Sequence, residues 1–177
     1  HIENIKAMGG ATVTAISDPH TPSQEAALAM APGAKVFTDH RALLDSGLID
    51  AVVIATPNDT HAAVLKDALA TDLAVFVEKP LATTVEDLRS ILSWDEKRSA
   101  MTWMGLEYRF MPPVAEAIAR AHEGEAGKIH QVSIREHREP FYPKVDNWNR
   151  FAERTGGTLV EKCCHYFNLM DIVVGET

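Results

Sequence analysis

The chain has 177 residues, which is long enough for one complete domain and part of a second. Lysine and arginine total 17 against 25 aspartate and glutamate, and the net charge of −8 argues against a nucleic-acid partner. The longest apolar run, 51–55, is far too short to cross a bilayer. Cys163 and Cys164 are adjacent and fit neither a disulfide framework nor a zinc pattern. We therefore expect buried thiols, no metal site and a reducing, cytoplasmic environment.

Short apolar runs alternate with helical segments over the first 106 residues. A helix through Met8 is ended by Gly9-Gly10 and is followed by predicted strands at 11–16, 35–37, 50–55, 74–78 and 101–106. Helices are predicted at 22–31, 39–45, 58–71 and 85–97, the second capped by Asp39 and the third by Asn58 or Asp59. This alternation predicts a doubly wound parallel sheet of the Rossmann type.

The pattern changes after Leu106. An amphipathic helix is predicted at 112–123, an alternating strand at 129–138, an irregular aromatic stretch at 140–155 and a single helix from Gly157 onward. One strand and two helices are too few to close a core. We therefore expect a doubly wound domain at 1–106 and the beginning of a second domain at 107–177.

The stretch 74–80 places two charged residues at the end of a buried strand. Four apolar residues run into Glu78, Lys79 and Pro80, and the proline cannot continue the ladder. Open α/β sheets bind ligands at the carboxyl ends of their strands, so Glu78 and Lys79 are candidates for a site. A Lys-Pro bond can also be cis at modest cost. The alternative is a lysine in a surface loop.

A dinucleotide fold also requires a first strand and a glycine-rich turn, and the sequence contains no G-x-G-x-x-G pattern. The helix that should follow such a turn is the first predicted element. We therefore expect a chain truncated at both ends, with a sheet position left empty between the strands at 11–16 and 50–55.

Five motifs in order resemble the glucose–fructose oxidoreductase/inositol dehydrogenase (Gfo/Idh/MocA) family. They are Asp18 after the first strand, 55–58 with His61, 78–80, 108–110, and Gly156-Gly157 before Glu161 and His165. The resemblance extends over essentially the whole chain. It implies a dinucleotide-binding domain followed by an α+β domain with a mostly antiparallel sheet. It also implies hydride transfer between NAD or NADP and a sugar, cyclitol or related polyol.

The resemblance assigns cofactor contacts to one group of residues: Asp18, Thr56, Pro57, Asn58, His61, Glu78, Lys79 and Pro80. A carboxylate after the second strand of such a fold accepts from the adenosine ribose 2′-OH. It would repel a 2′-phosphate, so NAD is favoured over NADP. The alternatives are a turn aspartate at position 18 and a plain helix cap at Asn58.

Catalytic roles are implied for Lys79, His165 and Glu161, and we expect these side chains to face one cleft, with Glu161 on the His165 side and Asn58 on the cofactor side. A cation beside the reacting hydroxyl stabilises a developing alkoxide, and histidine accepts the hydroxyl proton near neutral pH. The family usually has aspartate where this chain has Glu161, and positions 161 and 165 share one face of a continuous helix. The alternatives are a solvated helix edge for Glu161 and a core histidine for His165. Substrate contacts are suggested for Arg109, Lys162 and Trp148, with Arg138 and Tyr142 as further candidates that packing explains equally well.

The sequence therefore predicts an NAD-dependent sugar or polyol dehydrogenase that would form a homo-oligomer at full length. Two other classes stay open: a dinucleotide-binding sensor that does not turn over, and an inactive fragment.

Overall fold

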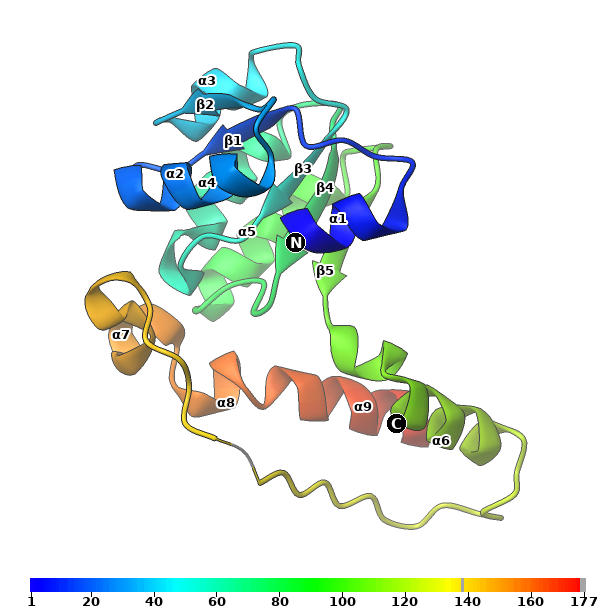
Figure 1. The fold of residues 1–177 in the computed structure, drawn as a ribbon. Coiled ribbons are helices and arrows are strands. Elements are labelled where there is room, and N and C mark those ends of the chain that lie inside the picture. Colours follow the sequence, from blue (N-terminus) through cyan, green and yellow to red (C-terminus); the bar gives the residue numbers. More distant parts are fainter. Residues whose placement is uncertain (138, 176–177) are drawn as a thin grey trace.

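The computed structural model describes residues 1–137 and 139–175. Its first part alternates strands and helices as the sequence predicts (Figure 1). In chain order these elements are α1 (Ile2–Met8), β1 (Ala15–Ser17), α2 (Thr21–Met30), β2 (Lys35–Phe37), α3 (His40–Leu44), β3 (Ala51–Ile54), the 3-10 turn η1 (Asn58–Thr60), α4 (His61–Ala68), β4 (Ala74–Glu78), α5 (Val85–Asp95) and β5 (Thr102–Gly105).

All strand pairs are parallel, and the strands form two separate groups. One sheet has the order β1-β2 and the other β3-β4-β5, so among the described strands no ladder joins β1 to β3. This is the position at which the sequence predicts an empty place. The predicted strand 11–16 is wrong over 11–14, because only Ala15–Ser17 pair, with a neighbour on one side alone.

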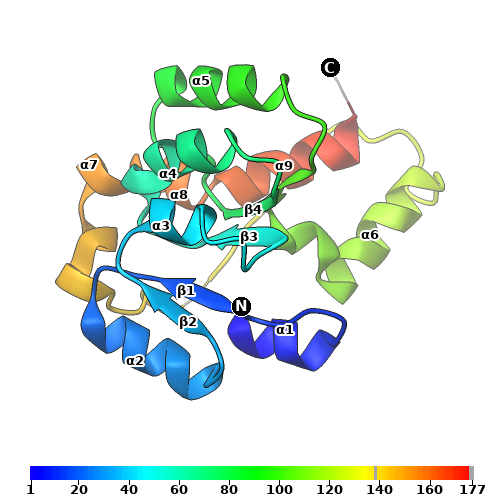
Figure 2. The same ribbon diagram turned by 90° about the horizontal axis from the view of Figure 1, so that it is seen from above.

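The core of the first part lies between the β3-β4-β5 sheet and the helices α4 and α5, which cover the same face of that sheet (Figure 2). Val75 and Val77 of β4 point into this core and pack with Leu65 and Ile91. Each is essentially inaccessible to solvent, and burying one such side chain stabilises the fold by about 1.5–3 kcal/mol. Because side chains alternate along a strand, Glu78 lies on the opposite face at the end of β4.

The capping predictions are confirmed at one of two helices. Asp39 caps α3 by accepting from the Arg41 backbone N–H. The prediction that Asn58 or Asp59 caps the next helix is wrong: a 3-10 turn precedes α4, and neither side chain forms a cap hydrogen bond. Asn58 is buried instead, and its side chain lines a cavity described below.

The second part contains only helical elements within residues 107–137 and 139–175. These are η2 (Glu107–Phe110), α6 (Pro112–His122), η3 (Val145–Arg150), α7 (Ala152–Thr155), α8 (Thr158–Glu161) and α9 (Cys164–Val174). The predicted strand at 129–138 is wrong over 129–137, which forms an extended segment without a ladder, because the described residues provide no neighbouring strand for it. Residue 138, a substrate candidate as Arg138, lies outside the described residues.

The two parts meet where α7 and α8 approach the first part. The Arg154 guanidinium binds Asp59 through two hydrogen bonds of 2.9 and 3.3 Å. Gly156 has φ +76°, and a Cβ there would lie 2.9 Å from the Val160 side chain and 3.2 Å from the Thr83 carbonyl oxygen. Only glycine accommodates both the left-handed backbone and this close approach.

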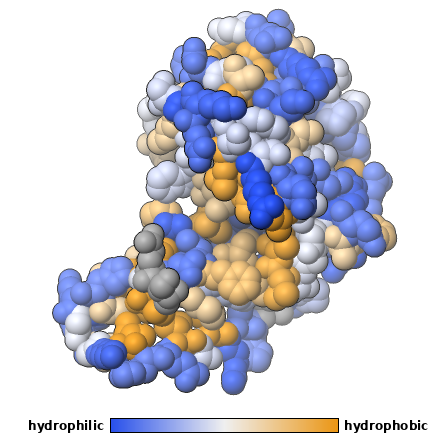
Figure 3. All heavy atoms as spheres, turned by 180° about the vertical axis from the view of Figure 1, so that it is seen from behind, coloured by the Kyte–Doolittle hydropathy of each residue, from blue (hydrophilic) through white to orange (hydrophobic). Residues whose placement is uncertain are grey.

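Large apolar side chains of the second part remain exposed, and Figure 3 shows apolar surface spread over this part of the molecule. Phe110, Phe151, Leu159 and Phe167 are each more than half exposed. None of the described helices is both long and apolar enough to pass through a membrane.

Candidate active site

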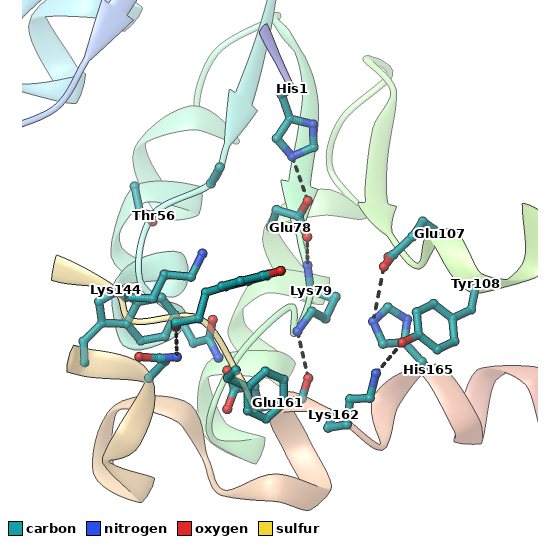
Figure 4. Close-up of a pocket in the computed structure, with 16 residues that line it drawn as sticks. His1, Thr56, Glu78, Lys79, Glu107, Tyr108, Lys144, Glu161, Lys162 and His165 are labelled. Atoms are coloured by element: carbon teal, nitrogen blue, oxygen red, sulfur yellow. Dashed lines mark hydrogen bonds and ion pairs between the residues drawn. The ribbon is translucent and has the colours of Figure 1, made fainter. Parts of the chain in front are cut away.

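A cavity of about 410 Å³ lies between the carboxyl ends of β3 and β4 and the α8–α9 region (Figure 4). Asn58 and Lys79 line it from the first part, and Glu161 and His165 line it from the second. The sequence predicted that these four side chains, separated by up to about a hundred positions, face one cleft. The structure brings all four together.

Lys79 follows β4 directly and reaches across the cavity. Its bond to Pro80 is cis, and its ammonium group donates to the backbone carbonyl of Glu161 at 2.9 Å. Glu78 accepts from the Lys79 backbone N–H at 3.2 Å and lies 2.7 Å from the His1 ring nitrogen Nε2. The end of β4 and the residue that follows it therefore contact both His1, which precedes α1, and the second part of the chain.

The prediction of a single helix carrying Glu161 and His165 is wrong, because the helix is interrupted between α8 and α9. In a continuous helix the Glu161 carbonyl would accept from the His165 N–H. Here it accepts from Lys79, and the His165 N–H instead lies 3.4 Å from the Lys162 carbonyl oxygen. The hydrogen bond from Lys79 to the Glu161 carbonyl therefore lies at the break between α8 and α9.

His165 is 2% exposed. Its ring stacks on Tyr108, with centroids 4.1 Å apart and planes inclined by 11°, and its Nε2 lies 3.7 Å from the Glu107 carboxylate. Burial, followed by the positive charges of Lys79 and Lys162, lowers the pKa of His165 to about 4. The imidazole is therefore neutral at pH 7 and able to accept a proton.

Lys162 also lines the cavity, but its ammonium group already has partners. It lies 2.9 Å from the Glu136 carboxylate and donates to the Tyr108 hydroxyl. Burial opposes its charge, but the hydrogen bonds to Tyr108 and Glu136 outweigh burial and raise its pKa. Lys79, by contrast, donates to the backbone carbonyl of Glu161, which a substrate oxygen could replace.

Three buried polar atoms of the cavity-lining residues have no hydrogen-bond partner within the described residues: Asn58 Nδ2, Asn149 Oδ1 and His165 Nδ1. A buried, unpaired amide is costly unless a ligand satisfies it. Asn58 and Asn149 together offer a donor and an acceptor in the cavity that Lys79 also lines, which fits the hydroxyl groups of a ribose or polyol. The residues present are therefore compatible with a nicotinamide nucleotide whose ribose lies in this cavity.

Asn149 was not among the residues selected from the sequence. It belongs to η3, where Asp146 and Asn147 have positive φ values of 52° and 50°, and its amide nitrogen donates to the Tyr142 carbonyl oxygen at 3.0 Å. Such strained residues cluster at functional sites, but positive φ cannot be read from sequence. The irregular aromatic stretch 140–155 was the available signal, and its residue Trp148 does line the cavity.

The remaining candidates divide between this cavity and other positions. Thr56 and Glu78 line the cavity. His61 is fully buried behind it, with its ring nitrogens 2.7 Å from the Pro80 carbonyl oxygen and 3.0 Å from that of Thr56, so it joins the two loops. The side chain of Pro57 is not part of the described cavity lining.

Asp18 and Arg109 also lie away from the described cavity lining. Asp18 follows β1, and its carboxylate accepts from the His20 N–H at 2.8 Å. This hydrogen bond forms the local turn that the sequence leaves open as the alternative to a cofactor contact for Asp18. The Arg109 guanidinium lies 5.8 Å from the centre of the Phe110 ring. Residues that the sequence did not indicate, His1, Glu107 and Lys144, line the cavity instead.

Comparisons with known proteins agree with this arrangement. Residues 1–106 match the description "Oxidoreductase family, NAD-binding Rossmann fold", and residues 119–177 match "Oxidoreductase family, C-terminal alpha/beta domain". Inositol 2-dehydrogenase of Rhizobium meliloti is 30% identical over 176 residues, which make up 99% of this chain and 51% of that protein. The chain thus spans about half the length of this curated relative.

Two solved structures from Lactobacillus casei are similar in fold. Myo-inositol dehydrogenase in complex with NAD(H) and myo-inositol is 32% identical, with a TM-score of 0.62 over 65% of this chain and 34% of that one. Scyllo-inositol dehydrogenase in its apo form has a TM-score of 0.80 over 99% of this chain and 51% of that one, and at 19% identity it supports the fold alone. From the match over residues 1–106, together with the motifs and the parallel sheet, this chain belongs to the Gfo/Idh/MocA family of oxidoreductases.

Proposed function

We propose that this chain forms the catalytic half of a dehydrogenase that transfers hydride between NAD and a hydroxyl-bearing carbon of a sugar, cyclitol or related polyol. The observation that carries the proposal is the meeting of Lys79 and a neutral His165 in one cavity, although they come from different parts of the chain. An oxidation of this kind requires a cation beside the reacting oxygen and a base for its proton. The names of the relatives support a polyol as substrate.

His165 would take the hydroxyl proton at Nε2, the ring nitrogen on the side of Glu107. The Glu107 carboxylate would then stabilise the imidazolium that forms. The Lys79 ammonium would exchange the Glu161 carbonyl for the substrate oxygen and stabilise the negative charge that develops there. The nicotinamide, when bound, supplies the hydride acceptor.

Glu161 is proposed as a residue of the substrate side of the cavity. Asn58, Thr56 and Glu78 are proposed to hold the nicotinamide ribose, with His61 fixing the loops that carry them. The sequence has no glycine-rich turn, so these assignments concern the nicotinamide end of the cofactor.

Asp18 supports NAD over NADP, because a carboxylate after β1 would repel a 2′-phosphate. We further propose a dinucleotide-binding domain at 1–106 and a substrate and oligomerisation domain beginning at 107. The full-length protein would form a homo-oligomer. It would lie in the cytoplasm, because the free thiols of Cys163 and Cys164 fit a reducing compartment.

The test is NADH formation, followed by absorbance, with a panel of inositols and sugars. We expect turnover with at least one polyol, and a loss of about a hundredfold or more in kcat for Lys79→Met with little change in the Kd for NADH. Lys66→Met, an exposed lysine on α4, is the matched control for loss of a positive charge. Tight NADH binding without turnover of any polyol would favour the sensor and contradict the dehydrogenase.

A further inference from the structure

Four side chains around His165 form a cluster that the proposed reaction does not use: Tyr108, Glu136, Lys162 and Tyr166. The Tyr108 ring lies nearly parallel to the His165 imidazole, at 4.1 Å between centroids and 11° between planes. Stacking of this geometry restricts the tilt of the imidazole ring. The orientation of His165 therefore depends on whatever holds Tyr108.

Lys162 holds Tyr108 in place. Its ammonium group donates to the Tyr108 hydroxyl and lies 4.6 Å from the centre of that ring. Lys162 is only 7% exposed, and a buried ammonium group is costly unless it is paired. The Glu136 carboxylate, 2.9 Å away, provides this pairing.

Glu136 connects the cluster to the extended segment 129–137. Its carboxylate accepts from the Tyr166 hydroxyl and from Lys162, and these two bonds lower the pKa of Glu136 to about 2. Tyr166 is the residue after His165 on α9. The Glu136 carboxylate therefore binds both Lys162, which supports Tyr108, and Tyr166 of α9, the helix that carries His165.

We infer that Tyr108 and Lys162 are positioning residues for His165, and that Glu136 fixes both of them. This inference rests on the proposed role of His165 as the proton acceptor. Tyr108 sets the orientation of the imidazole ring by stacking. Lys162 holds Tyr108 and adds a positive charge that favours the neutral ring, and Glu136 offsets part of that charge.

The charges around His165 give this inference a directional test. Positive groups favour the neutral ring, and negative groups favour the imidazolium. The charged groups that face His165 are Lys79, Lys162, Glu78, Glu107 and Glu136. The distances of Lys162 Nζ and the imidazole from the same Tyr108 ring place the two charges no more than roughly 9 Å apart. At that separation, removing one charge shifts the pKa of His165 by about one unit or somewhat less.

The experiment is an NMR titration of the His165 ring in the chain, with the resonance assigned from His165→Asn. Lys162→Met should raise the pKa of His165, Glu136→Gln should lower it, and the control Lys66→Met should leave it unchanged. A purely structural role would not produce shifts of opposite sign. Shifts of the same sign, or no shift in either variant, would overturn the inference.

Two further points keep the test decisive. If Lys162→Met does not fold, Glu136→Gln decides alone: a lowered pKa supports the inference, and an unchanged or raised pKa overturns it. The titration needs no turnover, so a chain that shows the opposed shifts but oxidises no polyol would refute the proposed function and leave this electrostatic coupling intact.

The stacking contact is tested separately by two variants of Tyr108. Tyr108→Phe keeps the stacked ring and loses the hydroxyl, whereas Tyr108→Leu loses both. If the ring orients His165, the Leu variant should lose at least tenfold more in kcat than the Phe variant, with a similar KM in both. Equal losses in the two variants would contradict the role of the stack.

Discussion

Acid should destabilise this protein in the pH range between the pKa values of His165 in the unfolded and the folded chain. In the folded chain the pKa of His165 is lowered from 6.5 to about 4, chiefly by burial. Below pH 6.5 the unfolded chain therefore binds a proton that the folded chain excludes until about pH 4. Because the unfolded state gains protons, the free energy of unfolding falls as the pH decreases through this range.

The size of the effect follows from the shift. Each pH unit within the range removes about 1.4 kcal/mol, so the loss approaches about 3 kcal/mol at pH 4. Carboxyl groups with lowered pKa values act later. The pKa of Glu136 is lowered to about 2 by its bonds to Tyr166 and Lys162, and the pKa of Asp67 is lowered by its bond to His40. These two carboxyl groups therefore reduce the free energy of unfolding only below their ordinary pKa values of 4.5 and 3.8.

Urea unfolding followed by circular dichroism at several pH values between 6.5 and 4.5 measures this dependence. His165→Asn has no titrating ring at this position, so its free energy of unfolding should change much less over the same range. Parallel pH dependences in the two proteins would refute the assignment of a buried, neutral His165.

Three other predictions concern separate contacts. Asp59 and Arg154 are 30% and 36% exposed, so the coupling energy of this ion pair should be about 0.5–1 kcal/mol. A double-mutant cycle of urea unfolding with Asp59→Asn and Arg154→Gln measures it, and no coupling would show that the pair does not join the two parts. Lys79→Met should reduce kcat while leaving NADH fluorescence titrations unchanged, because the ammonium acts on charge that develops in the transition state; a purely weakened Kd would contradict this. Asp18→Ser should weaken NAD binding and reduce the preference over NADP, and equal affinities in the unmutated protein would refute the role of Asp18.

Much of the first part could be predicted because local chemistry determines it. The apolar run that ends at Glu78, Lys79 and Pro80 forms β4 with its charged residues at the cavity, and the interruption of pairing lies beside β1 as expected. The family motifs also predicted, without any distance information, that Lys79 and His165 face one cavity, and both residues line it.

The errors arose where distant residues decide the structure. The segment 129–137 alternates like a strand but lacks a neighbour among the described residues, and the helix after Gly157 is interrupted where Lys79 binds the Glu161 carbonyl. The contact of Asn149 with the cavity depends on the left-handed residues before it. None of these contacts is encoded in local propensity or periodicity.

The central claim is that this cavity transfers hydride from a polyol carbon, and isotope transfer tests it most directly. Myo-inositol deuterated at its ring carbons would be incubated with the protein and NAD, and the mass of the recovered cofactor would be measured by mass spectrometry. The account predicts NADH that carries one deuterium, formed by the unmutated chain and by Lys66→Met but at least about a hundredfold more slowly by Lys79→Met. Unlabelled NADH, or labelled NADH formed equally fast by Lys79→Met, would contradict it.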